Sequence, residues 1–247
     1  MLEQNFAAFL MTLKPEQFSA EQAISLIDLT LLDENVSDFL LEQLVQKANL
    51  HNVAAVCVYP QNLTKIHTLT LPSIKLATVV NFPSGEHSLD RVLNEIEEAK
   101  FASEIDYVFP YQTYFTGGQQ AALTHCKAIY DCCQQKKLTF KVILESGALP
   151  SSKIYYLCMD IISQGCDFLK TSTGKIDIGA TPLAVFSMLQ AIQDSGTSCG
   201  IKISGGVKTG TQAFFYMRLA KQILDRELDN SWFRIGASSL IDNLLAK

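Results

Sequence analysis

Residues 167–204 read DFLKTSTGKIDIGATPLAVFSMLQAIQDSGTSCGIKIS and contain a strand, a helix and a second strand in succession. The short apolar runs at 167–170 and 200–204 are typical of buried strands. The intervening residues 181–194 have helical periodicity and begin with Thr181-Pro182, a pair that suits a helix N-terminus. Their apolar side chains share one helix face: Val185, Met188, Leu189 and Ile192. The stretch therefore predicts two parallel strands joined by a helix.

The same alternation continues along the whole chain. Apolar, β-branched runs alternate with helical stretches, as in a parallel sheet that is buried on both faces. The strand candidates are SLIDL (25–29), VAAVCVY (53–59), IKLATVV (74–80), EIDYVF (104–109), TFKVIL (139–144), DFLK (167–170), GIKIS (200–204) and FRIGAS (233–238). Eight such units in 247 residues predict an α/β fold, the (β/α)8 or TIM barrel.

An open, doubly wound sheet is the alternative architecture. Its dinucleotide-binding version carries G-x-G-x-x-G after the first strand, whereas residues 29–33 of this chain read LTLLD. We therefore favour the barrel. No Gly/Ser-rich or Pro-rich linker divides the chain, so residues 1–247 are expected to form a single domain. Residues 1–20 are expected to add an N-terminal helical segment.

The composition excludes several functional classes. The chain is 48% hydrophobic, enough for a large core, and its net charge of −5 has the wrong sign for nucleic-acid binding. Its seven cysteines include no Cys-x-x-Cys pair and predict reduced thiols. The N-terminal apolar run is short and ends at Lys14-Pro15, which suits neither a signal peptide nor a membrane span. We expect a soluble, cytoplasmic protein with no nucleic-acid or membrane partner.

The functional groups of a (β/α)8 barrel project from the carboxyl ends of its strands. Eight residues are assigned to these ends, most of them polar or ionisable, and two are lysines. They are Asp28, Cys57, Asn81, Asp106, Glu145, Lys170, Lys202 and Ser238. This pattern indicates an enzyme.

Lys170 and Lys202 would point into the same barrel mouth. A lysine amine is nucleophilic only when neutral, and at its ordinary pKa of about 10.4 roughly one in 2,500 is neutral at pH 7. A second ammonium about 6 Å away repels by about 3 kcal/mol at an effective dielectric of about 20, and so lowers the pKa. The pair therefore suits imine formation with a carbonyl compound. Alternatively, each lysine pairs with Asp28, Asp106 or Glu145, or extends to the rim.

Two carboxylates complete the predicted catalytic group. Asp106 could move protons to and from a substrate hydroxyl, directly or through a water, or could only pair with a lysine. Asp28 could orient Lys202 or bind a hydroxyl, or could only cap or pair. Cys57 is better explained as a small core residue than as a nucleophile, because no histidine lies at another strand end. The four histidines lack a metal-ligand spacing, so no metal site is expected.

Three loops after consecutive strands have the composition of an anion site. They are Thr171-Ser172-Thr173-Gly174-Lys175, Ser204-Gly205-Gly206 and Gly236-Ala237-Ser238-Ser239. Backbone N–H groups, hydroxyls and helix N-termini in such loops can bind phosphate, and barrels often hold phosphate after strands seven and eight. Glycine and serine are also ordinary turn residues, so the three loops together are the signal.

From about residue 22 to the C-terminus, the sequence resembles the deoxyribose-phosphate aldolases, a family of class I, Schiff-base-forming aldolases. The most specific segments are DFLKTSTGK (167–175) and GIKISGGVK (200–208). The other matching segments follow in the family's order: Leu29-Thr30, Val58-Tyr59-Pro60, VNFP (80–83), DYVFP (106–110), ILESG (143–147) and RIGASS (234–239).

The resemblance implies that Lys170 forms the Schiff base, that Lys202 lowers its pKa, and that Asp106 relays protons with support from Asp28. It also implies a site for the substrate phosphate, with Thr171 and Gly236 as further candidates in the same loops. The implied phosphate ligands are Gly174, Lys175, Gly205, Gly206, Ser238 and Ser239. A homodimer is expected from the resemblance alone.

The reaction that the resemblance implies is reversible cleavage of 2-deoxy-D-ribose 5-phosphate to D-glyceraldehyde 3-phosphate and acetaldehyde. No cofactor is expected, because the protonated imine is itself the electron sink. Ile203 and Lys208 depart from the proline and arginine common in the family, which could alter phosphate affinity. The alternatives are another imine-forming barrel aldolase with a different substrate, and a catalytically silent barrel that binds a phosphorylated metabolite.

Overall fold

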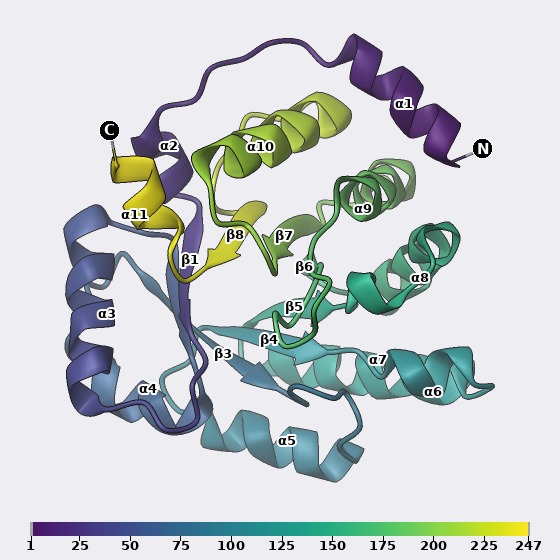
Figure 1. Ribbon diagram of the computed structural model, residues 1–247. Helices are drawn as coiled ribbons and strands as arrows, with labels where there is room; N and C mark the ends of the chain where they lie inside the picture. Colours follow the sequence, from purple (N-terminus) through teal and green to yellow (C-terminus); the bar gives the residue numbers. More distant parts are fainter. Residues whose placement is uncertain (1, 247) are drawn as a thin grey trace.

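The computed structural model describes residues 2–246 and shows a closed barrel of eight parallel strands (Figure 1). Each strand pairs with the next along the chain, and β8 pairs with β1 to close the barrel. The strands are β1 Ile27–Leu31, β2 Ala55–Val58, β3 Lys75–Val80, β4 Glu104–Val108, β5 Thr139–Ile143, β6 Phe168–Lys170, β7 Gly200–Ser204 and β8 Phe233–Ala237. The predicted TIM barrel is confirmed, and each predicted run overlaps a strand.

The depth of several side chains differs from the prediction. Asp28 is the second residue of β1, and Asp106 and Lys202 are the third residues of β4 and β7. These three therefore lie within the barrel instead of at the ends of their strands, whereas Lys170 is the last residue of β6. The first strand extends past the predicted 25–29 because Leu31 still pairs with β2.

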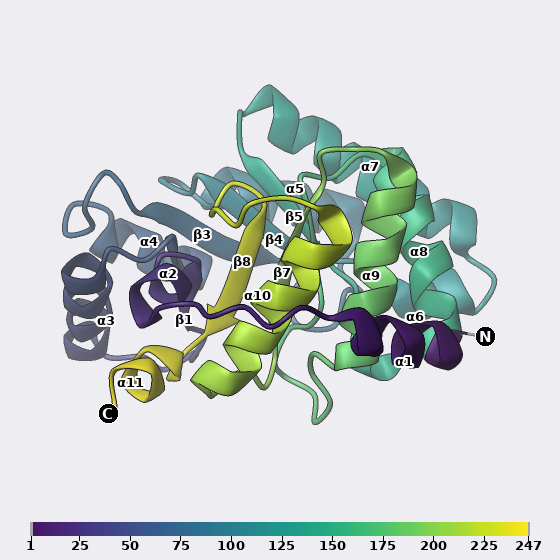
Figure 2. The same cartoon turned by 90° about the horizontal axis from the view of Figure 1, so that it is seen from above.

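Helices connect successive strands and surround the barrel (Figures 1 and 2). They are α1 Leu2–Thr12, α2 Ala20–Ile24, α3 Asp38–His51, α4 Pro60–Ile66, α5 Leu89–Glu98, α6 Tyr111–Phe115, α7 Gln119–Gln135, α8 Ser151–Gln164, α9 Pro182–Ser195, α10 Gly210–Leu224 and α11 Leu240–Leu245. The helix predicted at 181–194 is α9, and the Thr181 side chain caps it by accepting a hydrogen bond from the N–H of Ala184. Within residues 2–246, no helix has the length and apolar character needed to cross a bilayer.

The strands contribute to two separate apolar regions because successive side chains point to opposite faces. On β2, Val56 and Val58 belong to the main core, which includes the buried faces of the helices. Ala55 and Cys57 belong instead to a small cluster on the other face of the wall, inside the barrel. This cluster contains Ala55, Cys57, Ala77, Val79, Phe82, Val108 and Ile143. Only part of the barrel interior is therefore apolar.

The N-terminal segment passes over the outside of α9 and α10 (Figure 2). Phe6 and Phe9 of α1 contact Phe186 of α9, with ring centroids 5.1 and 5.5 Å apart. Residues 13–19 are extended, and the Phe18 ring lies 6.2 Å from that of Phe214 on α10. Of the predicted helical segment at residues 1–20, the helix thus covers Leu2–Thr12, and Met1 lies outside the described residues.

Candidate active site

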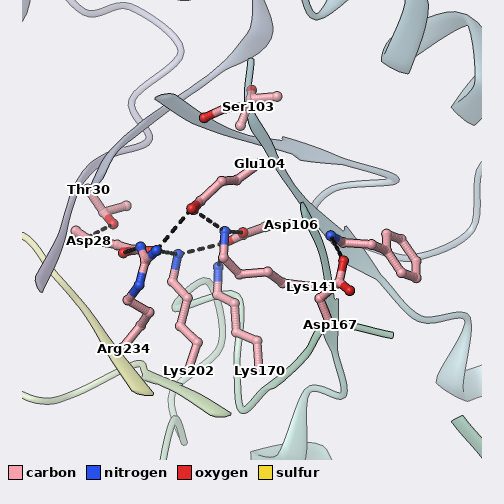
Figure 3. A network of polar contacts seen from close by, with 12 residues as sticks. Asp28, Thr30, Ser103, Glu104, Asp106, Lys141, Asp167, Lys170, Lys202 and Arg234 are labelled. Carbon is pink, nitrogen blue, oxygen red and sulfur yellow. Dashed lines mark hydrogen bonds and ion pairs between the residues drawn. The ribbon is translucent and has the colours of Figure 1, made fainter. Parts of the chain in front are cut away.

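Six buried, charged side chains form a closed ring of ion pairs inside the barrel (Figure 3). The ring joins Lys202 to Asp28 (2.6 Å) and Asp106 (2.7 Å), Lys141 to Asp106 (3.0 Å) and Glu104 (2.6 Å), and Arg234 to Glu104 (3.0 Å) and Asp28 (2.6 Å). None of the six side chains is more than 5% exposed. Each charge in the ring therefore has two partners of opposite sign.

Strand register explains why these residues meet. Asp106 on β4 is opposite Lys141 on β5, and Lys202 on β7 is opposite both Lys170 on β6 and Arg234 on β8. Residues in register on neighbouring parallel strands point to the same face at the same level of the sheet. In the closed barrel, β4 lies beside β5 and β1 lies beside β8, so the strands that carry the carboxylates adjoin the basic strands at both ends.

Lys170 is the seventh charged group and has no carboxylate of its own. Its Nζ donates a hydrogen bond to Oδ2 of Asp106 at 2.7 Å, and the same oxygen accepts a hydrogen bond from Lys202 at 2.7 Å. The ring of three carboxylates and three cations is already neutral. A charged Lys170 would add an uncompensated positive charge to a buried site, which is unfavourable. The arrangement therefore favours a neutral amine at Lys170.

The pKa shifts have the same direction as this charge balance. Burial is the largest influence on the pKa of Lys170, and together with the Lys202 ammonium it outweighs Asp106 and lowers that pKa. For Lys202 and Lys141, burial also opposes the charged form, but the adjacent carboxylates outweigh it and raise both pKa values. Burial favours protonation of Asp106, yet its three lysine partners hold its pKa well below the usual range. Lys170 is thus the one lysine of this group poised to lose its proton.

A pocket of about 360 Å³ opens beside Lys170 at the carboxyl ends of the strands. Its wall consists of the loops after β1, β6, β7 and β8. Among the predicted phosphate ligands, it includes Gly174, Lys175, Gly205, Gly206, Gly236, Ser238 and Ser239. Lys175 and Lys208 add two positive charges to the lining against one carboxylate, Asp33, and Nζ of Lys175 donates a hydrogen bond to the Leu32 carbonyl at 2.7 Å. The pocket therefore suits a small anionic compound that reaches Lys170.

Three lining glycines have backbone conformations that favour glycine. Gly174, Gly205 and Gly206 have φ angles of 77°, 83° and 93°. At Gly205, an added Cβ would also lie 2.9 Å from Cα of Gly179. The turn after β7 therefore depends on glycine for both its conformation and its packing.

Thr171 is the exception among the predicted substrate ligands. Its side chain is fully buried and does not line the pocket. Its Oγ1 donates a hydrogen bond to the Ser204 carbonyl and accepts one from the Ser204 N–H, both at 2.8 Å. The prediction that Thr171 binds substrate was wrong because the position after Lys170 points away from the mouth. There the Thr171 hydroxyl links β6 to β7 through these two hydrogen bonds.

Cys57 has the surroundings of a core residue. Its side chain is fully buried in the apolar cluster inside the barrel. Burial is the main cause that raises its pKa, so the thiol is protonated at neutral pH.

A larger hollow, about 670 Å³, lies at the opposite end of the barrel and is lined by Lys75, Thr139, Phe168 and Arg226, among others. It does not include Lys170 or the glycine-rich loops. In barrels of this kind the chemistry takes place at the carboxyl ends of the strands, so we assign the smaller pocket as the candidate active site.

Sequence reasoning missed Glu104, Lys141 and Arg234. A signal for all three was present, because each is a charged residue within an otherwise apolar strand. Glu104 also lies two positions before Asp106 and so shares its face of β4. These three residues do not lie at strand ends, so the rule that functional groups project from the strand ends does not identify them.

A family model described as "DeoC/LacD family aldolase" matches residues 22–239, which is most of the chain. This chain belongs to the DeoC/LacD aldolase family. The match spans every strand of the barrel and all seven charged residues described above.

Solved structures of this architecture agree with the assignment. A deoxyribose phosphate aldolase from Aeropyrum pernix, described as tetrameric, is 27% identical over 92% of this chain and 91% of its own, with a TM-score of 0.76. A Coccidioides immitis protein, provisionally assigned as a deoxyribose-phosphate aldolase, is 23% identical over 98% of this chain and 95% of its own, with a TM-score of 0.82. At that identity the second likeness concerns the fold alone.

Proposed function

We propose that this DeoC/LacD-family protein is a class I aldolase that reversibly cleaves 2-deoxy-D-ribose 5-phosphate to D-glyceraldehyde 3-phosphate and acetaldehyde. The observation that carries the proposal is the position of Lys170. It is the lysine without a carboxylate of its own beside a neutral ring of ion pairs, and it faces a pocket lined by loops suited to phosphate. The 27% identical Aeropyrum pernix structure, which is titled as this enzyme, supports the choice of substrate.

Imine formation would begin with attack of the neutral Lys170 amine on C1 of the open-chain aldehyde. The resulting carbinolamine must lose water, and the Lys202 ammonium, which shares Oδ2 of Asp106 with Lys170, is placed to donate the proton for that loss. The product is an iminium ion between Lys170 and the substrate. Its positive charge lies where Nζ of Lys170 lay, and Asp106 is the adjacent carboxylate that stabilises it.

Carbon–carbon cleavage would follow from the iminium ion. Asp106, through a water, would accept the proton of the C3 hydroxyl, and the electrons of the C2–C3 bond would move toward the iminium nitrogen. This step releases D-glyceraldehyde 3-phosphate and leaves an enamine on Lys170. The protonated Asp106, through the same water, would return its proton to C2 of the enamine. Hydrolysis of the resulting iminium ion would then release acetaldehyde, restore the Lys170 amine and return a proton to Lys202.

The phosphate would bind in the pocket formed by the loops after β6, β7 and β8. Lys175 and Lys208 provide positive charge there, and Gly205 and Gly206 allow close approach of the backbone. A phosphate bound in this pocket would fix the position of the C2–C3 bond relative to the imine, which lowers the entropic part of the activation barrier.

Borohydride trapping tests both the reaction class and the nucleophile. The protein is reduced with borohydride in the presence of acetaldehyde or 2-deoxyribose 5-phosphate, and the modified peptide is identified by mass spectrometry. We expect a substrate-dependent adduct on Lys170 that is absent from Lys170→Ala and retained in Lys153→Ala, which changes a lysine of α8 outside the pocket. Adducts scattered over surface lysines, or no adduct, would refute the proposal.

A further inference from the structure

Glu145 is a buried carboxylate that the proposed mechanism does not use. It lies two residues after the end of β5, is 1% exposed, and has a left-handed backbone conformation with φ of 54°. It takes part in none of the ion pairs found within residues 2–246. A buried carboxylate in a conformation that L residues rarely adopt requires an explanation.

The carboxylate of Glu145 is bound to the loop that follows Lys170. It accepts a hydrogen bond from the N–H of Thr173 at 3.2 Å and another from the Thr173 hydroxyl. Because that hydroxyl donates its proton to Glu145, its oxygen remains free to accept the N–H of Lys175, at 3.0 Å. Glu145 therefore fixes the backbone on both sides of Gly174, at the wall of the phosphate pocket.

The residues that follow Glu145 contact the same loop through their backbone. The N–H of Ser146 donates to the Thr171 carbonyl at 2.8 Å. A Cβ added to Gly147 would lie only 1.8 Å from the carbonyl oxygen of Ile178, so only glycine fits there without displacing the loop. The turn at 145–147 thus contacts the loop after β6 near its start and near its end.

The contacts continue from this loop to the next one. The N–H of Ala180 donates to the Gly205 carbonyl at 2.9 Å, and a Cβ added to Gly179 would lie 2.2 Å from that same oxygen. The loops after β5, β6 and β7 are therefore stacked by direct backbone contact. A displacement at residues 145–147 would be transmitted to the pocket wall.

We propose that Glu145 and Gly147 are positioning residues that hold the loop at 173–179 in the conformation that binds phosphate, and so determine preference for a phosphorylated substrate. This inference rests on the proposed function for its substrate. Neither residue lines the pocket or belongs to the ion-pair ring that holds Lys170. The Glu145 carboxylate attracts the charged form of Lys170, so its loss should weaken phosphate binding without hindering formation of the neutral amine that makes the imine.

The test compares kcat and KM for 2-deoxyribose 5-phosphate and for unphosphorylated 2-deoxyribose. For Glu145→Ala, we expect KM for the phosphorylated sugar to rise about tenfold, since a charge-assisted hydrogen bond is lost. Activity on the unphosphorylated sugar should change by less than about threefold. Glu145→Gln keeps one acceptor oxygen and should show an intermediate KM, and Glu42→Ala, at an exposed position of α3, is the control.

Two further variants guard against a failure to fold. Thr173→Val has nearly the same shape, keeps the backbone donor and removes only the hydroxyl, so it should raise KM for the phosphorylated sugar in the same direction. Gly147→Ala should do so as well, because the loop must move away from the new methyl group. Equal losses with both sugars, or unchanged KM values in folded variants, would overturn the inference.

Binding of inorganic phosphate, measured by calorimetry, separates this inference from the proposed function. An affinity that is about tenfold weaker in Glu145→Ala than in the wild-type protein would support the positioning role, even if the wild-type protein fails to trap acetaldehyde. Equal phosphate affinities in the two proteins would refute it, even if trapping on Lys170 succeeds.

Discussion

At the scale of single residues, the site depends on a difference between three neighbouring lysines. Lys141 and Lys202 each have two carboxylate partners, whereas Lys170 shares an oxygen of Asp106 with Lys202. Burial opposes the charged form of all three, but only for Lys170 does it outweigh the carboxylates and lower the pKa. Similar side chains in one dry site can therefore have opposite protonation tendencies, set by the number of carboxylates that each one contacts.

Replacement of Lys202 by methionine should shift the pH dependence of the reaction. The Lys202 ammonium lowers the pKa of Lys170, so its removal should raise that pKa. Activity is expected to rise with pH as Lys170 loses its proton, and the midpoint of this rise should move to higher pH. A shift of about one pH unit would reduce the neutral fraction of Lys170 about tenfold at pH 7. The measurement is the pH profile of kcat/KM for aldol cleavage.

Lys141→Met is the matched control for this prediction. It opens the same ring and should destabilise the fold by a similar amount, about 3–5 kcal/mol. Lys202 is the cation among the main influences on the pKa of Lys170 and Lys141 is not, so the midpoint should move less in Lys141→Met. Equal midpoints in the two variants would show that Lys202 has no specific influence on Lys170.

At the scale of elements, the sequence was sufficient to predict the strands and the residues that line the pocket at their carboxyl ends. Apolar runs and caps such as Thr181 identify strands and helices locally, and Lys170 and the glycine-rich loops follow directly from them. The closed ring could not be predicted in the same way. Its ion pairs depend on which residues of neighbouring strands are in register, for example Asp106 with Lys141, and on the diameter of the closed barrel.

The same limitation explains the error at Thr171 and why Glu145, which was considered as a lysine partner, was not predicted to bind Thr173. Both residues are polar and adjoin a strand end, as a substrate ligand does, so composition cannot separate the two roles. The side chain of Thr171 is bound to the Ser204 backbone and that of Glu145 to Thr173, contacts that span 33 and 28 positions of the chain. Such distant partners become visible only when the loops are placed in space.

Helix α1 should open more readily, independently of the barrel, when one of its two aromatic contacts with Phe186 is removed. Phe9 contacts Phe186 of α9, whereas Met11 on the same helix is 91% exposed. Phe9→Ala should reduce the hydrogen-exchange protection of residues 2–12 by about tenfold to a hundredfold, because about 1–3 kcal/mol of apolar and aromatic packing is lost. Met11→Ala should leave the protection of these residues unchanged, and aldol cleavage should be the same in both variants.

At the scale of the whole molecule, the ring makes folding stability depend on pH. The folded-state pKa values of Asp28 and Asp106 are lowered, because their lysine and arginine partners outweigh the effect of burial. Stability from these carboxylates is therefore fully present above their unfolded pKa of about 3.9 and is lost as pH falls toward the folded values. Their contribution favours the folded state throughout the neutral range.

Chemical denaturation at a series of pH values tests this dependence. We expect the free energy of unfolding to fall steeply below about pH 4 in the wild-type protein. Asp28→Asn should show a shallower slope over the same range, because one carboxylate with a lowered pKa has been removed, whatever the cost of the substitution at neutral pH. Parallel slopes in the two proteins would contradict the assignment of acid sensitivity to the ring.

The ring also divides the chain into two halves of opposite sign. Its three carboxylates, Asp28, Glu104 and Asp106, all come from β1 to β4, whereas Lys141, Lys170, Lys202 and Arg234 all come from β5 to β8. A half-barrel closing on a second copy of itself would bring like charges together in a dry interior, and the repulsion there is strong. Only the union of a first half with a second half pairs all six charges of the ring. The ion pairs of the ring should therefore favour closure of the barrel within one molecule over pairing between identical halves of different molecules.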